Sequence, residues 1–241
     1  MLCKWEKLPP ELQTEAVRPY YDRLRKKQVS LLVKRIFDVV VSALMLLLLS
    51  PVFLVLAIAI KLDSPGPVFY RQVRVTQYGK QFRIFKFRSM VQNADKGSLV
   101  TVGGDSRITR VGRLIRKCRL DEICQLIDIL RGTMTFVSTR PEVPKYVEKY
   151  TPEMMATLLL PAGVTSLASI CYKDEDRLLE GAKDVDKVYI EEVLPGKMRY
   201  NLKAIKSCSF WGDIKLMFMT VLAILGKDYN PEEEKEPAGS K

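Results

Sequence analysis

An arginine-rich run that ends at two adjacent carboxylates is the part of the sequence best suited to chemistry. The arginines recur every third residue, at Arg107, Arg110, Arg113 and Arg116. On a helix this spacing keeps them within one broad stripe. Asp121 and Glu122 follow. Guanidinium groups bind phosphate oxygens in pairs, and they favour the ionised form of a neighbouring carboxylate. The run therefore predicts a phosphate site whose carboxylates act as a nucleophile toward phosphorus or as metal ligands.

The absence of histidine excludes several kinds of site. The 241 residues are enough for one or two domains and include no histidine. Ser-His-Asp and Cys-His nucleophile pairs, HExxH zinc sites and imidazole proton shuttles are thereby excluded. The 5 cysteines include no CxxC pair, which argues against a thiolate zinc site. We expect free, buried thiols in a reducing compartment.

The positive charge is concentrated in one stretch of the chain. The formal net charge is +11, and residues 61–120 alone carry an excess of basic over acidic residues equal to that total. Such a stretch attracts phosphates, nucleic acid or anionic lipid. An ordinary solvated basic face is the alternative interpretation.

An uncharged apolar segment from Val39 to Ile60 predicts a membrane element. As a straight helix it would be about 33 Å long, against about 30 Å for a bilayer core. Pro51 deprives the Leu47 carbonyl of its helical partner, and the Ser50 hydroxyl is placed to bond back and compensate in part. Basic residues flank both ends, which the positive-inside rule does not allow for a simple span. A re-entrant hairpin is therefore favoured over spanning, and a buried core helix is the least favoured alternative.

The remaining pattern predicts an α+β fold that is mainly helical with a small β-hairpin. Strands are expected at 68–75 and 82–87, and a loop at 93–106. Phe210-Trp211 opens a further apolar stretch, whose residues 216–225 are too short to span and suit an interfacial amphipathic helix or a core helix equally. Further helices are expected at 8–33, 114–130, 144–160 and 172–193.

Several ordered motifs resemble the bacterial sugar transferase family, the small monotopic polyprenyl-phosphate phosphoglycosyl transferases. The likeness is clear from Lys34 to Arg140 and weaker to Gly226. The matching stretches are Lys34–Asp38, the Ser50-Pro51 break, Ser64–Gln72, Phe85–Met90, Arg107–Arg113, Leu120–Glu122 and Gln125-Leu126.

The resemblance implies transfer of a sugar-1-phosphate from a UDP-sugar to undecaprenyl phosphate, with release of UMP. Asp121 would be the nucleophile of a two-step reaction, and Glu122 would assist, both as ligands of Mg²⁺. Arg116 and Arg140 would bind phosphate by positional match, and the other candidate phosphate or substrate ligands are Arg88, Arg107, Arg110 and Arg113. The implied partners are the two substrates and membrane lipid, without nucleic acid, and a homodimer stays open.

The residue pattern and the resemblance together predict how the chain is organised. A surface helix at 1–33 would precede a re-entrant membrane helix at 34–62, a cytoplasmic catalytic domain at 63–228 and a disordered tail at 229–241. The membrane-hairpin residues would be Lys34, Arg35, Asp38, Ser50 and Pro51. The location would be the bacterial inner membrane, with the catalytic domain on its cytoplasmic face.

Departures from the family pattern leave two other functions open. They fall at Cys124, Ser138, Thr139 and Ala162. The dyad and Arg140 are unchanged. The departures therefore put the sugar specificity and the geometry of the surrounding loops in doubt. The alternatives are a membrane-tethered protein that binds nucleic acid or other anions, and an inactive family member that acts as a scaffold. The basic stretch with interleaved aromatic residues supports the former, whereas the apolar run and the dyad count against it.

Overall fold

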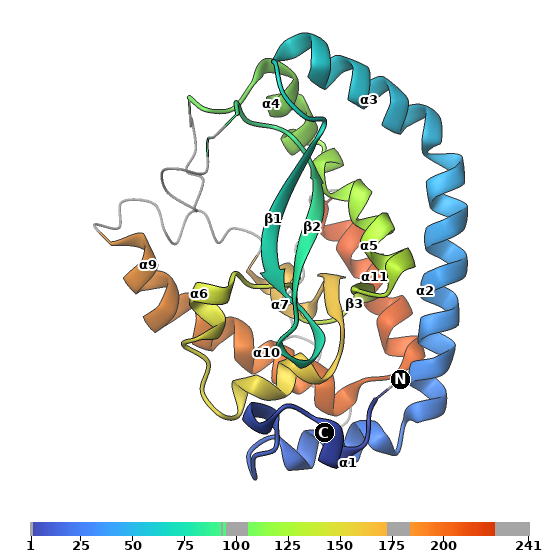
Figure 1. The fold of residues 1–241 in the computed structure, drawn as a ribbon. Helices are drawn as coiled ribbons and strands as arrows, with labels where there is room; N and C mark the ends of the chain where they lie inside the picture. Colours follow the sequence, from blue (N-terminus) through green and yellow to red (C-terminus); the bar gives the residue numbers. More distant parts are fainter. Residues whose placement is uncertain (1, 93, 95–105, 173–183, 225–241) are drawn as a thin grey trace, which may run out of the picture.

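The computed structural model describes residues 2–92, 94, 106–172 and 184–224 (Figure 1). A long bent pair of helices forms one edge of the molecule, an antiparallel hairpin crosses its middle, and shorter helices lie behind and below the hairpin. The tail expected at 229–241 and most of the loop expected at 93–106 lie outside the described residues. The mainly helical fold with a small hairpin is confirmed.

The predicted break at Ser50-Pro51 is present. Helix α2 (Gln28–Leu48) and helix α3 (Ser50–Asp63) are bent by 60° relative to each other. Because Pro51 has no N–H to donate to the Leu47 carbonyl, that carbonyl needs another donor. The Ser50 hydroxyl donates to it at 2.8 Å, as the sequence suggested.

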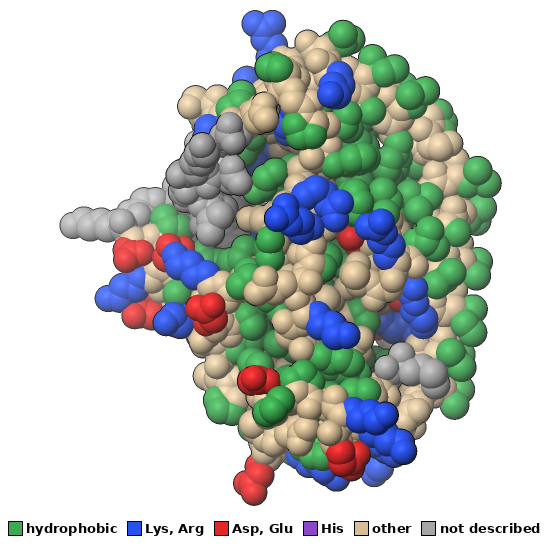
Figure 2. Space-filling model, in the orientation of Figure 1, with side chains coloured by type: hydrophobic (Ala, Val, Ile, Leu, Met, Phe, Trp, Pro, Cys, Tyr) green, Lys and Arg blue, Asp and Glu red, His purple; other side chains and the backbone are tan. Residues whose placement is uncertain are grey.

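The outward surface of this bent pair is apolar. Leu47 is 71% exposed and Leu62 is 83% exposed, and hydrophobic side chains follow the outer edge of the molecule along α2 and α3 (Figure 2). Within the described residues, no single helix is long and apolar enough to cross a bilayer. The two helices of the bent pair together reach the length and apolar composition that a crossing would need. An exposed apolar surface of this kind is typical of a membrane or protein contact.

The inward face of α2 carries buried charges instead. Lys34 donates to the Val137 carbonyl at 2.7 Å and forms an ion pair with Asp213. Asp38 accepts a hydrogen bond from the Thr135 hydroxyl at 2.6 Å and another from a backbone N–H of the same strand at 3.3 Å. Since a buried charge is tolerated only with partners, these contacts hold α2 against the strand that contains Thr135 and Val137.

Two arginines connect the bent pair to the rest of the protein, one near the start of α2 and one after the end of α3. Arg35, near the start of α2, donates to the Ile129 carbonyl at 2.6 Å, at the end of helix α5 (Leu126–Arg131). Arg88 is buried and donates to the Ser64 carbonyl at 2.6 Å, directly after α3 ends. The carbonyls at helix ends lack helical partners, and guanidinium groups satisfy them here.

The antiparallel hairpin predicted at 68–75 and 82–87 is confirmed. Strand β1 (Phe69–Val75) pairs with strand β2 (Gln81–Phe87), and Tyr70 lies opposite Lys86. The aromatic side of the hairpin packs on α3 and on helix α4 (Arg110–Lys117) around the buried Phe87. Its other side is available to the site.

A second, parallel strand pair was not predicted. Strand β3 (Met134–Val137) pairs with strand β4 (Ala162–Thr165). Each strand has only four residues, and the pairing joins segments well separated in sequence. Short apolar runs of this kind give no clear period, which is why the sequence did not indicate them.

The helix expected at 114–130 is wrong, and the correction concerns the dyad. Helix α4 ends at Lys117, and Arg119 adopts a left-handed backbone with φ of 55°. A short 3₁₀ segment, η5 (Leu120–Gln125), follows before α5 begins. A non-glycine residue in this conformation interrupts an α-helix, so the arginine run and the dyad lie on different elements.

The helices expected at 8–33 and 144–160 are also divided into shorter ones. Of the helix expected at 172–193, the structure describes only Tyr172 and 184–193, and the latter is helical from Val185. At the N-terminus, η1 and η2 precede helix α1, which is not only a surface helix because Tyr20, Tyr21 and Leu24 are buried in the core. Within 144–160, a non-helical stretch that contains Pro152 separates Val147 from Met154, and 173–183 lies outside the described residues. The remaining elements are η1 (Trp5–Lys7), η2 (Pro10–Leu12), α1 (Arg18–Arg25), η3 (Gln77–Gly79), α6 (Pro144–Val147), η6 (Met154–Leu159), α7 (Leu167–Cys171), α9 (Val185–Val188), the π-helical turn η7 (Tyr189–Val193), α10 (Leu194–Ser207) and α11 (Phe210–Ile224).

The buried pair between α2 and α11 predicts an effect on stability. Replacing Lys34→Met leaves the Asp213 carboxylate buried without its partner, and we expect unfolding to become easier by about 3–5 kcal/mol. The side chains of Lys34 and Asp213 are only 11% and 17% exposed. Thermal unfolding in detergent measures the change.

The exposed pair between Arg18 and Asp22 provides a matched control. Its side chains are 51% and 49% exposed, so Arg18→Met should cost less than about 1 kcal/mol. Equal losses for the two variants would contradict the proposed importance of the buried pair.

Candidate active site

The two carboxylates of the dyad point to different surroundings. Asp121 and Glu122 lie in the first turn of the 3₁₀ segment η5, which begins at Leu120, directly after the left-handed Arg119. Asp121 lines a cavity of about 360 Å³, whereas Glu122 faces two cations. Adjacent residues with such different partners are expected to have different chemistry.

Glu122 is held by a bidentate arginine and a lysine. Arg140 donates to Glu122 Oε1 at 2.5 Å and to Oε2 at 3.2 Å, and Lys86 donates to Oε1 at 3.2 Å. Burial alone would raise the pKa of Glu122, but the charges of Arg140 and Lys86 outweigh burial and hold that pKa well below its ordinary value. Glu122 is therefore a fixed carboxylate, and Arg140, expected to bind phosphate, is engaged by it in this structure.

Asp121 differs from its neighbour in both contacts and pKa. Burial and the charge of Glu122 raise the pKa of Asp121, and the opposing charges of Lys86 and Arg116 do not offset them. The expectation that neighbouring guanidiniums would favour the ionised form is therefore wrong for Asp121, because desolvation is the larger effect. In the part of the chain that the structure describes, no side chain of another residue donates a hydrogen bond to the Asp121 carboxylate. Asp121 is thus the carboxylate open to a ligand in the cavity.

The cavity lies between the polar side of the hairpin and the segment that follows β2. Lys86, Tyr70 and Arg74 line it from the hairpin, and Arg116 and Asp121 line it from α4 and η5. The full lining consists of Pro67, Phe69, Tyr70, Gln72, Arg74, Lys86, Phe87, Arg88, Ser89, Met90, Val91, Gln92, Ala94, Arg107, Arg116 and Asp121. This mixture of apolar surface and convergent cations suits an anionic organic ligand.

The structure brings some of the predicted arginines together and separates others. Arg88, Arg107 and Arg116 line the cavity, although Arg88 is engaged by backbone carbonyls and Arg107 donates to the Ala94 carbonyl at 2.6 Å. Arg110 and Arg113 are exposed on α4 and do not line it. The three-residue stripe therefore divides, because the helix begins only at Arg110 and its exposed side turns away from the cavity.

Sequence reasoning missed the contribution of the hairpin. Lys86 contacts Glu122, and Tyr70, Gln72 and Arg74 line the cavity from β1. The available signal was their alternation, since residues at i, i+2 and i+4 of a strand share one face. A polar set at this spacing indicates a strand whose second face is not packed in the core.

The donor set of the dyad fits a magnesium ion only in part. Mg²⁺ is usually held by one or two carboxylates together with substrate phosphates and water. Glu122 is already neutralised by two cations, which leaves Asp121 as the carboxylate suited to a metal. The described residues contain no group of three or more His, Cys, Asp or Glu side chains that could hold a metal ion. A metal here would thus depend on Asp121 and on the phosphates of a substrate.

Two departures from the family pattern have visible consequences. Cys124 is buried, and its thiol donates to the Asp121 carbonyl at 3.4 Å. Burial raises the pKa of this thiol, so it behaves as a packed group of the core. The cysteines are free as expected, but the expectation that all are buried is wrong, because Cys118 is exposed.

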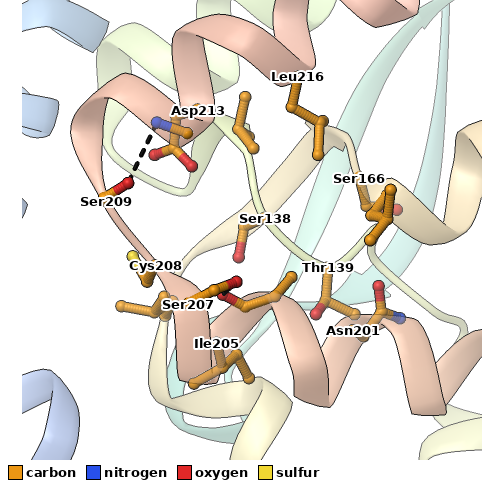
Figure 3. A pocket seen from close by; sticks show the side chains of 15 residues that line it. Ser138, Thr139, Ser166, Asn201, Ile205, Ser207, Cys208, Ser209, Asp213 and Leu216 are labelled. Atoms are coloured by element: carbon orange, nitrogen blue, oxygen red, sulfur yellow. Dashed lines mark hydrogen bonds between the residues drawn. The ribbon is translucent and has the colours of Figure 1, made fainter. Parts of the chain in front are cut away.

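Ser138 and Thr139 lie at a second, smaller cavity (Figure 3). It has a volume of about 120 Å³ and is lined from the ends of β3 and β4, from α10 and from the start of α11, where the Ser209 hydroxyl accepts from the Gly212 N–H at 3.1 Å. Asp213, the partner of Lys34, lies at its edge. The departures at Ser138 and Thr139 thus add hydroxyl groups on the way from β3 to Arg140.

Comparison with known proteins identifies the family. A family model described as bacterial sugar transferase matches residues 29–227. The chain belongs to the bacterial sugar transferase family. The resemblance carried by the motifs from Lys34 to Arg140 is thereby confirmed, and the dyad, the cavity and all of the bent helix pair except Gln28 fall within the matched range.

Named relatives of this chain differ in the sugars that their names give. A "UDP-N-acetylgalactosamine-undecaprenyl-phosphate N-acetylgalactosaminephosphotransferase" from Aeromonas hydrophila is 35% identical over 80% of this chain and 44% of its own length. A "UDP-glucose:undecaprenyl-phosphate glucose-1-phosphate transferase" from Escherichia coli (strain K12) is 36% identical over 88% and 44%. One with the same name from Caulobacter vibrioides is 35% identical over 81% and 70%. The chain thus spans less than half the length of the first two relatives.

The clamp on Glu122 predicts a pH-dependent contribution to stability. We expect Glu122→Gln to lower the free energy of unfolding by about 1–3 kcal/mol near neutral pH, because it removes the charge that Arg140 and Lys86 neutralise. The folded pKa is depressed, so the contribution is full above the unfolded value of about 4.3 and declines as the pH falls below it.

Denaturant unfolding of both proteins between acidic and neutral pH measures this difference. The exposed pair of Lys145 and Asp186, whose side chains are 51% and 42% exposed, supplies the control, and Asp186→Asn should change stability by less than about 1 kcal/mol. A difference between wild type and Glu122→Gln that grows as the pH falls would contradict the assignment.

Proposed function

We propose that this protein transfers a sugar-1-phosphate from a UDP-sugar to undecaprenyl phosphate and releases UMP. The observation that carries the proposal is Asp121, an open carboxylate that lines a cavity together with Arg116 and Lys86. The names of the relatives describe this reaction for those proteins. Because those names differ in the sugar, the proposal leaves the sugar unassigned.

The chemistry follows from the two environments of the dyad. Asp121 attacks the phosphorus that carries the sugar, the bond from that phosphorus to the bridging oxygen breaks, and its electron pair leaves with UMP. An oxygen of undecaprenyl phosphate then attacks the same phosphorus and releases Asp121. A carboxylate with a raised pKa is the more basic nucleophile once ionised, and Lys86 and Arg116 stabilise the charge that develops on the phosphoryl oxygens.

Magnesium belongs to this proposal as a cofactor bound with the substrate. Asp121 would hold it together with the diphosphate, and it would supply charge neutralisation for the leaving phosphate. Glu122, Arg140 and Lys86 keep the dyad segment in place throughout the reaction.

The bent helix pair is proposed as a re-entrant membrane element on the cytoplasmic face of the bacterial inner membrane. The segments before and after the pair lie in one body, which supports entry and exit on one side. Cys3, before α2, donates its N–H to the Tyr78 hydroxyl at 2.9 Å, and Tyr78 lies in the hairpin that follows α3. A pair that crossed the bilayer would place these segments on opposite sides.

The nucleophile is tested by comparing wild type with Asp121→Asn. Membranes are incubated with undecaprenyl phosphate and with radiolabelled UDP-glucose, UDP-galactose or UDP-N-acetylgalactosamine, and UMP release is measured. We expect the variant to lose at least about a thousandfold in rate, because the group that forms the new bond is missing. Label should remain covalently bound to wild type only.

The exposed Asp22 gives a matched control, and Asp22→Asn should retain wild-type release. Equal UMP release by wild type and Asp121→Asn would reject the nucleophile. No release by wild type with any of these sugars would favour the inactive scaffold.

The topology is tested with single cysteines at two exposed positions, Lys26, which precedes α2, and Lys61, which lies in the last turn of α3. In a background with the native cysteines replaced, we expect a membrane-impermeant maleimide to label both positions in inverted vesicles and neither in intact cells. Labelling from opposite sides would contradict a re-entrant pair.

A further inference from the structure

Three polar side chains of β1 form one wall of the cavity. Tyr70, Gln72 and Arg74 alternate along the strand and therefore share a face of the hairpin. Lys86 lies opposite Tyr70 in the strand register and reaches Glu122 at 3.2 Å. The wall thus begins beside the dyad and continues along β1 toward Arg74.

Arg74 fixes the orientation of the Gln72 amide. Its Nε and Nη2 donate to Gln72 Oε1 at 3.1 Å and 2.7 Å. A guanidinium group is a donor only, so the oxygen of the amide must face Arg74 and the NH₂ group must face away. Gln72 Nε2 donates to no group in the part of the chain that the structure describes, and its residue lines the cavity. The result is an oriented donor with its hydrogens unused.

Arg74 and Gln72 are anchored to the segment whose Arg140 clamps Glu122. Arg74 Nη1 donates to the Pro141 carbonyl at 3.1 Å, and Pro141 follows Arg140, the residue that clamps Glu122. Two residues along a strand correspond to about 7 Å, so Gln72 lies about that far along the wall from the level of Lys86. The donor is therefore rigidly placed relative to Asp121.

The geometry points to Gln72 as a sugar-binding residue: its amide N–H donates a hydrogen bond to an oxygen of the sugar carried by the nucleotide, and Arg74 is the positioning residue. This inference rests on the proposed function. The phosphorus attacked by Asp121 has to lie about 3 Å from the carboxylate, and the sugar is bonded directly to that phosphate. The nucleobase is separated from it by a second phosphate and the ribose. The Gln72 amide lies about 7 Å along β1 from the position of Lys86, which contacts the dyad. At that distance it reaches the sugar more readily than the nucleobase, which lies farther from the attacked phosphorus.

Direct binding tests the inference without requiring turnover. In the full chain carrying Asp121→Asn, calorimetry in detergent measures the Kd of UMP and of UDP-glucose, UDP-galactose and UDP-N-acetylgalactosamine, with the tightest of the three as the probe. Gln72→Met removes the donor without adding charge, and Gln72→Glu keeps the contact with Arg74 while replacing the donor by an acceptor. We expect both to weaken the UDP-sugar about three- to tenfold and to leave UMP unchanged.

Gln81, exposed at the start of β2, provides the matched control, and Gln81→Met and Gln81→Glu should change neither Kd. Equal weakening of UMP and of the UDP-sugar would overturn the inference, since the contact would then be to the nucleotide. An unchanged UDP-sugar Kd would overturn it as well. If none of the three sugars binds before any change at Gln72, the proposed function fails together with the inference, whereas binding without UMP release by wild type rejects only the transfer reaction.

Discussion

Neutralising the buried charge of Glu122 is the constraint on which the site depends. A carboxylate removed from water is costly unless cations and hydrogen bonds replace its hydration. Arg140 supplies a bidentate contact from the segment between β3 and β4, and Lys86 supplies a second charge from β2. One side chain thus joins the dyad segment, the hairpin and the parallel strand pair. The position of Asp121 follows, because it is the residue before this fixed point.

The bent helix pair is tied into the same arrangement by similar physics. Lys34 and Asp38 are buried on the inner face of α2, and their contacts are made with β3 and α11. β3 leads directly to Arg140, so the strand that the helix holds is the strand that positions the clamp. The outward face of the same helix is apolar and exposed. A single helix therefore presents apolar side chains on one side and, on the other, holds the strand that leads to the clamp on the dyad.

Features set by local residue order were predictable from the sequence, and those set by distant contacts were not. The break at Pro51, its repair by Ser50 and the hairpin follow from rules that act over a few residues. The left-handed Arg119, the pairing of β3 with β4 and the engagement of Arg140 by Glu122 depend on where the chain returns in space. The prediction that all four arginines of the run share one helical stripe was wrong for the same reason. Periodicity describes a continuous helix, and α4 begins only at Arg110.

The opposite pKa shifts of adjacent carboxylates explain how one dyad serves two purposes. If both were free, their mutual repulsion and that of a diphosphate would oppose binding. Glu122 is paired, so its charge is offset by Arg140 and Lys86, and its remaining influence is to raise the pKa of Asp121. Asp121 is left as the less stabilised anion, facing a cavity in which Arg116 offers compensation to a phosphate. The absence of histidine is consistent with this design, since a carboxylate that attacks phosphorus and is later released needs no separate base to activate it.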